Sequence, residues 1–295
     1  MPEPASPNPL AALSAALAAM VAGLAAGIVS VRSKASRSSG FVWRPGLIVT
    51  ADDALPDEGE VAVTCPGGDT VAARIVGRDP TTDVALLRVE RADLPPVPLA
   101  MPSTSVGGLA VAVGAEEGAP TAAFGVVSRA GGPWQSLRGG AIDARIELDL
   151  VLRRTGEGGL VLDAAAGQAI GMAVFGPRRR VLVIPAATIE RVAARLESHG
   201  RIARGYLGLG LQPVAIGGGG SGAMVMSIDP QGPGARAGIH QGDILVAWNG
   251  EPVRHVHALM RALGPDSVNR TVTLGLRRAG ETRQVSLTIA EGPAP

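Results

Sequence analysis

The stretch that decides the fold is Arg154-Thr155-Gly156-Glu157-Gly158-Gly159-Leu160-Val161-Leu162-Asp163. A Gly-x-Gly-Gly turn here runs into an apolar strand, and Gly167 separates that strand from a second apolar run at 169–174. A turn, a strand, a hairpin and a second strand in succession are typical of a β-rich domain. Glu157 lies at the centre of the turn.

The composition indicates two folded, β-rich domains. The chain has 295 residues, of which 46% are hydrophobic and 18% charged, enough for two cores. Forty-one glycines and 23 prolines separate many short apolar runs, as expected of strands rather than long helices. The net charge is +1 with both signs interspersed, so nothing indicates nucleic-acid binding.

The sequence does not support a metal site with cysteine and histidine ligands. Cys65 is the single cysteine, so no internal disulfide is possible. The four histidines, which lie far from Cys65 and in no ligand spacing, are His199, His240, His255 and His257. The sequence therefore predicts no cofactor.

Short apolar runs between turn residues predict strands from Ile28 to about Ile184, in the regular spacing of a barrel or a pair of barrels. A helix is predicted over 186–198, ending at Gly200, because Ile189, Val192, Ala193 and Leu196 share one face. The basic segment 201–205 then reads as a linker to a second β-rich unit.

Residues 8–26 are apolar and uncharged, with Leu and Met recurring every three or four positions. Asn8 is a suitable N-cap and Pro9 a suitable first helical residue. The first basic residue, Arg32, follows the apolar run, whereas a secretory signal would carry it in front. We expect a docked or oligomerising helix, with a signal or membrane anchor as the alternative.

Several motifs in order resemble the HtrA/Deg family of trypsin-like proteases. They are S-G-F-V-W-R-P-G-L-I-V-T-A-D-D-A-L (39–55), G-R-D-P-T-T-D-V-A-L-L (77–87), the turn at 154–163, R-G-Y-L-G-L (204–209) and G-P-G-A-R-A-G-I-H-Q-G-D-I-L-V-A-W-N-G (232–250). The resemblance implies a mostly β chain: a chymotrypsin-like double β-barrel followed by a PDZ domain, with an N-terminal helix. The implied segments are 1–27 for the helix, 28–199 for the protease-like domain and 200–295 for the PDZ domain.

The resemblance places Asp53, Asp83 and Glu157 at the three positions of the catalytic triad, where the family carries His, Asp and Ser. Only Asp83 is retained. A serine protease needs a hydroxyl nucleophile and an imidazole base, and no histidine precedes His199. Gly156, Gly158 and Gly159 could still form the backbone turn of an oxyanion hole. We therefore expect no active catalytic residue.

In the PDZ domain the family resemblance implies that Tyr206, Leu207, Gly208 and Leu209 form the loop that captures a peptide carboxylate. Val256, Leu259, Met260 and Leu263 fall at helical spacing opposite it, with Leu259 expected in the peptide groove. The expected partners are peptides or proteins with apolar C-termini.

The leading hypothesis is a catalytically inactive HtrA-like pseudoprotease that binds peptides as an adaptor or chaperone-like protein. One alternative is an active endopeptidase that uses unconventional residues. Another is a carboxylate cluster of Asp53, Asp83 and Glu157 that holds a proton, recruits Arg153 or Arg154, or binds a hard divalent cation.

The sequence does not decide the oligomeric state or the cellular location. The family's trimers form through N-terminal segments, so the resemblance implies a possible homo-oligomer through residues 8–26. Membrane association is undecided, and a cytoplasmic location is slightly favoured over a periplasmic or membrane-anchored one.

Overall fold

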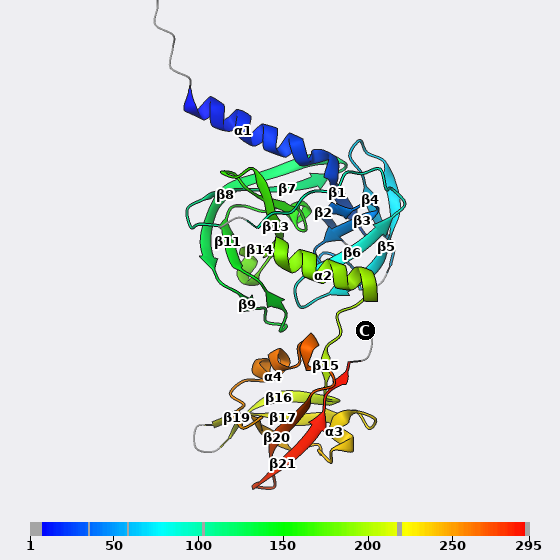
Figure 1. Ribbon diagram of the computed structural model, residues 1–295, viewed down its shortest axis with the longest axis vertical. Coiled ribbons are helices and arrows are strands. Elements are labelled where there is room, and N and C mark those ends of the chain that lie inside the picture. The colour runs from blue at the N-terminus through cyan, green and yellow to red at the C-terminus, as the bar shows by residue number, and fades with distance from the viewer. Residues whose placement is uncertain (1–7, 35, 58, 102–103, 217–219, 293–295) are drawn as a thin grey trace, which may run out of the picture. The chain divides into compact units, whose positions relative to one another are not determined.

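A computed structural model describes residues 8–34, 36–57, 59–101, 104–216 and 220–292 (Figure 1). The chain divides into two compact units. Residues 1–134 and 141–201 make up the first, and residues 135–140 and 202–295 make up the second.

The first barrel closes in the strand order β1-β2-β3-β6-β5-β4. Its strands are β1 (Ile28–Arg32), β2 (Arg37–Arg44), β3 (Leu47–Thr50), β4 (Val61–Thr64), β5 (Thr70–Asp79) and β6 (Val84–Val89). Valines, leucines and isoleucines from all six strands fill the interior, since alternate side chains of a closed barrel point inward. Short strands follow one another through this region and close into a barrel, so the barrel prediction is confirmed.

The second barrel closes in the order β11-β14-β13-β12-β7-β8. Its strands are β7 (Leu109–Glu116), β8 (Ala119–Gly131), β11 (Arg145–Asp149), β12 (Leu160–Asp163), β13 (Gln168–Phe175) and β14 (Val181–Pro185). A small two-stranded sheet of β9 (Trp134–Gln135) and β10 (Ala141–Ile142) interrupts the connection from β8 to β11. The segment 154–163 thus lies where the chain enters the barrel through β12.

Helix α2 (Ala186–His199) follows β14 and packs on β5, β6, β13 and β14, and so contacts both barrels. Ile189, Val192, Ala193 and Leu196 are its buried face. Gly200 ends it in the left-handed conformation, at φ 72°. Both features confirm the sequence prediction for this helix.

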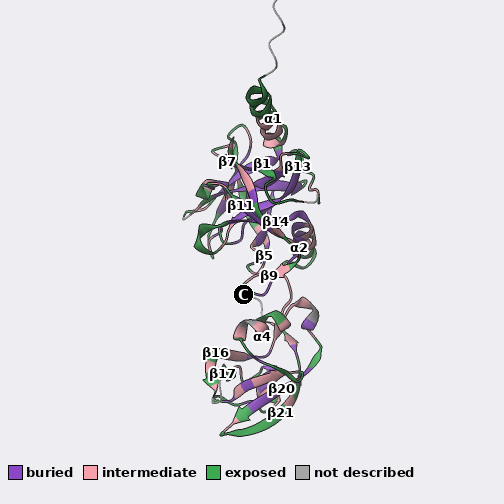
Figure 2. Cartoon of the chain, turned by 90° about the vertical axis from the view of Figure 1, so that its left-hand side faces the viewer, coloured by how far each residue is buried: buried purple, intermediate pink, exposed green. Residues whose placement is uncertain are grey.

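Helix α1 (Pro9–Leu24) continues into a 3-10 turn, η1 (Ala25–Gly27). The Asn8 side chain accepts a hydrogen bond from the Leu10 amide, 3.1 Å long, so the predicted N-cap is confirmed. No residue of α1 is buried, as the exposed and intermediate colours of Figure 2 show. Pro9–Gly27 is long and apolar enough to cross a membrane. Leu10 and Leu13 are exposed, whereas the large apolar residues nearer the C-terminal end of α1 are partly buried and the helix contacts β8.

The second unit is built on a sheet ordered β16-β17-β18-β20-β21, with β19 beside β18 and a separate β15–β22 pair. Its strands are β15 (Gly205–Tyr206), β16 (Leu209–Ile216), β17 (Gly220–Ile228), β18 (Ile244–Trp248), β19 (Glu251–Pro252), β20 (Thr271–Arg278), β21 (Glu281–Thr288) and β22 (Ala290–Glu291). Its helices are α3 (Pro233–Arg236), α4 (Val256–Ala262) and the 3-10 turn η4 (Pro265–Ser267). The unit has its own apolar core.

Candidate functional site

The structure brings two of the three predicted acids into contact. Asp53 lies in the loop after β3, and Asp83 directly precedes β6, which pairs with β3. The Asp53 amide donates a hydrogen bond of 2.8 Å to Oδ1 of Asp83. Asp83 has a φ of 58°, unusual for a residue with a side chain. The Asp53 side chain is exposed, whereas that of Asp83 is half-buried.

Glu157 lies at the turn that leads into β12. The Ser39 amide donates to its carbonyl over 2.7 Å, and the Phe175 amide donates to Oε1 over 3.4 Å. Gly158 follows with a φ of 81°, and a Cβ there would lie 2.3 Å from the Ser39 carbonyl oxygen. The turn thus needs glycine at 158 both for its conformation and for its space.

The backbone of the turn is hydrogen-bonded to itself. Residues 154–156 form a 3-10 turn, η2, and the Glu157 amide donates to the Arg154 carbonyl over 3.1 Å. In serine proteases the amide of the nucleophile residue is one of the two oxyanion donors. At Glu157 that donor already has an acceptor, so the predicted oxyanion turn is not open in this conformation.

Burial and repulsion between carboxylates oppose the ionisation of Asp83 and Glu157. Burial, followed by the charges of Asp53, Glu157 and Asp52, raises the pKa of Asp83 to about 8, against the hydrogen bond from the Asp53 amide. Burial also raises the pKa of Glu157, and the charge of Asp53 adds to this. The three predicted acids therefore act on one another electrostatically.

Arginine does not neutralise Glu157 directly. No ion pair from Arg153 or Arg154 to Glu157 is found within the part of the chain that the structure describes. Arg154 and Arg179 lower its pKa from a greater distance, but burial outweighs them. Among the described residues, no group of three or more acids, histidines or cysteines could hold a metal ion.

Sequence reasoning missed an ion pair beside this site. Asp52 is buried, and its Oδ1 accepts a 2.5 Å hydrogen bond from Nε of Arg78, whose other nitrogens donate to the carbonyls of Pro56 and Asp52. Burial raises the pKa of Asp52, while Arg78 opposes the rise. The two adjacent acids at 52 and 53 could have indicated this ion pair, but the family motif singles out Asp53 alone.

In the second unit the predicted carboxylate loop joins β15 to β16. The carbonyls of Leu207 and Gly208 accept hydrogen bonds from the amides of Gly234 and Asp229, both 2.8 Å long. Among the described residues, neither the Leu207 nor the Gly208 amide donates to a protein acceptor. Gly208 has a φ of 72°, and Tyr206 donates its hydroxyl to Asp229 over 3.2 Å.

Within the described part of the chain β16 pairs only with β17, so its other edge is open. Helix α4 lies next to β16. Leu259, expected in the groove, is only 2% exposed and belongs to the core of the unit. The groove position of Leu259 stays a prediction, because helical spacing alone cannot separate a core-facing from a groove-facing residue. Met260 is a large hydrophobic residue of α4 that is exposed.

Comparison with known families matches both units. Residues 38–172 match the trypsin-like peptidase domain, and residues 205–289 match the PDZ domain. A protein of Bartonella henselae named as a DegP-like periplasmic serine endoprotease is 32% identical over 280 residues, which is 89% of this chain and 54% of that protein. A protein of the same name from Chlamydia trachomatis is 30% identical over 279 residues, 88% of this chain and 55% of the relative. The chain thus spans about half the length of these relatives.

Solved structures have the same architecture. A serine endoprotease from Yersinia pestis superposes with a TM-score of 0.70 at 27% identity, over 93% of this chain and 97% of that one. The HtrA-type protease AlgW, solved with a decapeptide, gives a TM-score of 0.71 at 20% identity over 94% and 99% of the two chains, which supports the fold alone. The chain therefore combines a trypsin-like peptidase domain with a PDZ domain, and the proteins that it resembles are named DegP-like serine endoproteases and HtrA-type proteases.

Proposed function

We propose that this protein is a catalytically inactive HtrA-like protein that binds peptides through its PDZ domain, in an adaptor or chaperone-like role. One observation carries the proposal: the side chain at the turn of the former nucleophile is the carboxylate of Glu157, and its amide is bonded to the Arg154 carbonyl. A carboxylate here cannot replace a hydroxyl activated by an imidazole, and no histidine precedes His199.

The second unit supports peptide binding. The Leu207 and Gly208 amides are available to a C-terminal carboxylate, and the open edge of β16 can pair with an extended peptide. The charge of the carboxylate strengthens such hydrogen bonds. We infer that the ligands are peptides with a free, apolar C-terminal residue, bound at about micromolar affinity.

Two alternatives keep specific support. The relatives are named serine endoproteases, which favours residual hydrolysis by unconventional residues. The pKa of about 8 at Asp83 favours a proton-responsive role for Asp53, Asp83 and Glu157, because such a group changes charge near neutral pH.

We also propose a periplasmic location, in place of the cytoplasmic one that the sequence slightly favoured. The relatives are named periplasmic, and the exposed, apolar α1 has the length of a membrane-crossing helix. The same helix could instead join copies of this chain in a homo-oligomer.

Hydrolysis and peptide binding are tested separately. The purified chain should leave casein intact, alongside an Asp53→His/Glu157→Ser variant that restores both missing groups. Casein turnover by the unaltered chain, abolished by a serine-directed covalent inhibitor, would overturn the inactive assignment. For binding, a peptide with an apolar, free C-terminus is compared with its amidated form, and equal affinities would remove the role of the loop at 206–209.

A further inference from the structure

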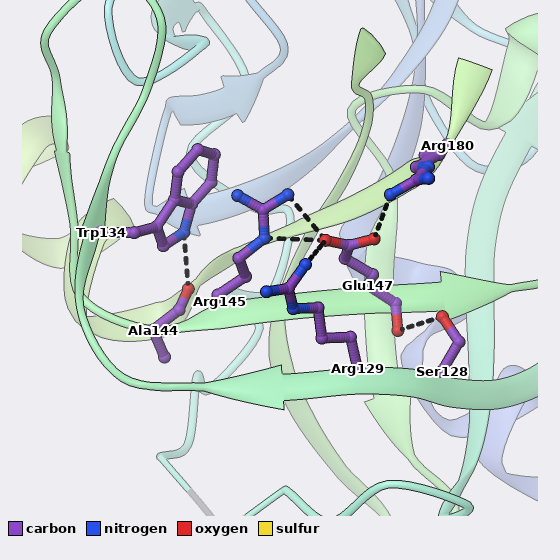
Figure 3. A network of polar contacts seen from close by, with 7 residues as sticks. All are labelled: Ser128, Arg129, Trp134, Ala144, Arg145, Glu147 and Arg180. Carbon is purple, nitrogen blue, oxygen red and sulfur yellow. Dashed lines mark hydrogen bonds and ion pairs between the residues drawn. The ribbon is translucent and has the colours of Figure 1, made fainter. Parts of the chain in front are cut away.

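A single buried carboxylate holds three arginines on the second barrel. Glu147 in β11 is 7% exposed, and its Oε1 lies 2.6 Å from a terminal nitrogen of Arg145. Arg180 lies 3.3 Å from Oε2, and Arg129 lies 3.6 Å from Oε1. Figure 3 shows the three guanidinium groups reaching this carboxylate from different parts of the chain. Three positive charges surround one negative charge, so two are in excess.

The carboxylate is firmly positioned and ionised. Arg145 also stacks on Trp134, with its guanidinium 4.5 Å from the ring centre, and the Trp134 indole donates to the Ala144 carbonyl. Although burial raises the pKa of Glu147, the hydrogen bond and charge of Arg145 and the charges of Arg180 and Arg129 outweigh it and lower the pKa overall. Glu147 therefore stays charged and fixes the arginines around it.

A pocket of about 570 Å³ opens beside this cluster. Its charged lining consists of Arg129, Glu147, Asp149 and the run 178–180, and apolar residues include Leu148, Leu150 and Val181. Four arginines thus face two carboxylates, and Arg145 adds a further positive charge behind Glu147. The pocket has a net positive lining.

Two of these arginines have no acidic partner within the described residues. Arg178 and Arg179 lie in η3 (Pro177–Arg179), and neither forms an ion pair there. Arg179 lies over the Phe175 ring, 4.9 Å from its centre. Both have a φ of 58°, a conformation that is unfavourable for a residue with a side chain. Repulsion and backbone strain both oppose this arrangement, and a bound anion would relieve the repulsion.

We propose that this pocket binds a phosphate-type group that carries two or more negative charges. Guanidinium forks match the geometry of phosphate oxygens and bind them through paired, charge-assisted hydrogen bonds. The four arginines of the lining exceed its two carboxylates, Glu147 and Asp149, by two charges, and a dianion balances this excess. The site is separate from peptide capture by the PDZ domain and does not depend on it.

Glu147 competes with the ligand for the same arginines. Replacing it by Gln removes a negative charge from the pocket wall and releases Arg129 and Arg180. Phosphate-type anions should then bind the Glu147→Gln variant more tightly, by about tenfold. A purely structural Glu147 would give the opposite result, weaker binding together with a lower melting temperature.

The test uses the full chain and tripolyphosphate, titrated by calorimetry at constant ionic strength. An Arg178→Gln/Arg179→Gln variant should weaken binding at least about tenfold while keeping the melting temperature, because neither arginine holds a protein carboxylate. The matched control is Arg74→Gln/Arg88→Gln, which removes two exposed arginines that face each other across β5 and β6. Its affinity should equal that of the unaltered chain.

The proposal would be overturned if the two double variants lost the same affinity for tripolyphosphate. It would also be overturned if tripolyphosphate did not bind at constant ionic strength. Vesicles that contain phosphatidic acid, whose phosphate monoester can carry two negative charges, distinguish the source of the group. Cosedimentation that requires Arg178 and Arg179 would assign a lipid phosphate, whereas tripolyphosphate binding without cosedimentation would assign a soluble one.

Discussion

The Asp53 amide donates a 2.8 Å hydrogen bond to the Asp83 carboxylate, and the charged side chain of Asp53 adds to the repulsion that Asp83 experiences. The same residue thus supports the Asp83 carboxylate with its backbone and opposes its ionisation with its side chain. This relationship makes the stability of the fold depend on pH.

Asp83→Asn should stabilise the protein at alkaline pH. The folded pKa of about 8 lies above the ordinary value of 3.8, so the folded state binds the extra proton between these values. The contribution of Asp83 to the free energy of unfolding is therefore fully present below pH ~4. It falls by up to about 1.4 kcal/mol per pH unit as the pH rises toward the folded pKa. Asn can still accept the Asp53 hydrogen bond. Melting curves from pH 5 to 9 should diverge as pH rises; parallel curves would exclude a repulsive cluster.

Arg78→Met should destabilise the first barrel by about 3 kcal/mol near pH 7, because it leaves the buried Asp52 carboxylate without its partner. Urea unfolding measures the change. The loss should shrink at acidic pH, where Asp52 becomes neutral. Adding Asp52→Asn should recover part of the stability, and a double variant that is no better would mean that Arg78 acts mainly on the Pro56 carbonyl.

Gly158→Ala should cost about 3–4 kcal/mol, because it combines a positive φ with overpacking against the Ser39 carbonyl. Gly167→Ala is the matched control: its φ is 66° but nothing lies within 4 Å of the added Cβ. This control should cost about 1–2 kcal/mol. Equal losses in thermal unfolding would show that the turn at 158 can move.

Removal of residues 1–25 should reduce association without unfolding the barrels, since no residue of α1 is buried. Light scattering should give a smaller assembly mass, and circular dichroism should retain the strand signal. Leu10→Ser/Leu13→Ser, which changes two exposed side chains, should have the same effect in the full chain. An unchanged mass in both cases would rule out assembly through α1.

The sequence alone predicted the parts of the fold that depend on local patterns. Apolar spacing and turn residues gave the barrel strands and the buried face of α2, and Asn8 and Gly200 ended their helices as expected. Such features depend on neighbours within a few positions, so they can be predicted without knowing the partner surface.

Tertiary structure decided which side chains meet. Barrel closure brings Arg78 to Asp52 across 26 positions and Arg180 to Glu147 across 33, and no local pattern encodes such pairs. The core position of Leu259 and the bond from the Glu157 amide to Arg154 depend in the same way on packing and on the path of one turn. Sequence determined the elements and the types of residue at the site; burial, charge and hydrogen bonding at the site depend on strand register and closure.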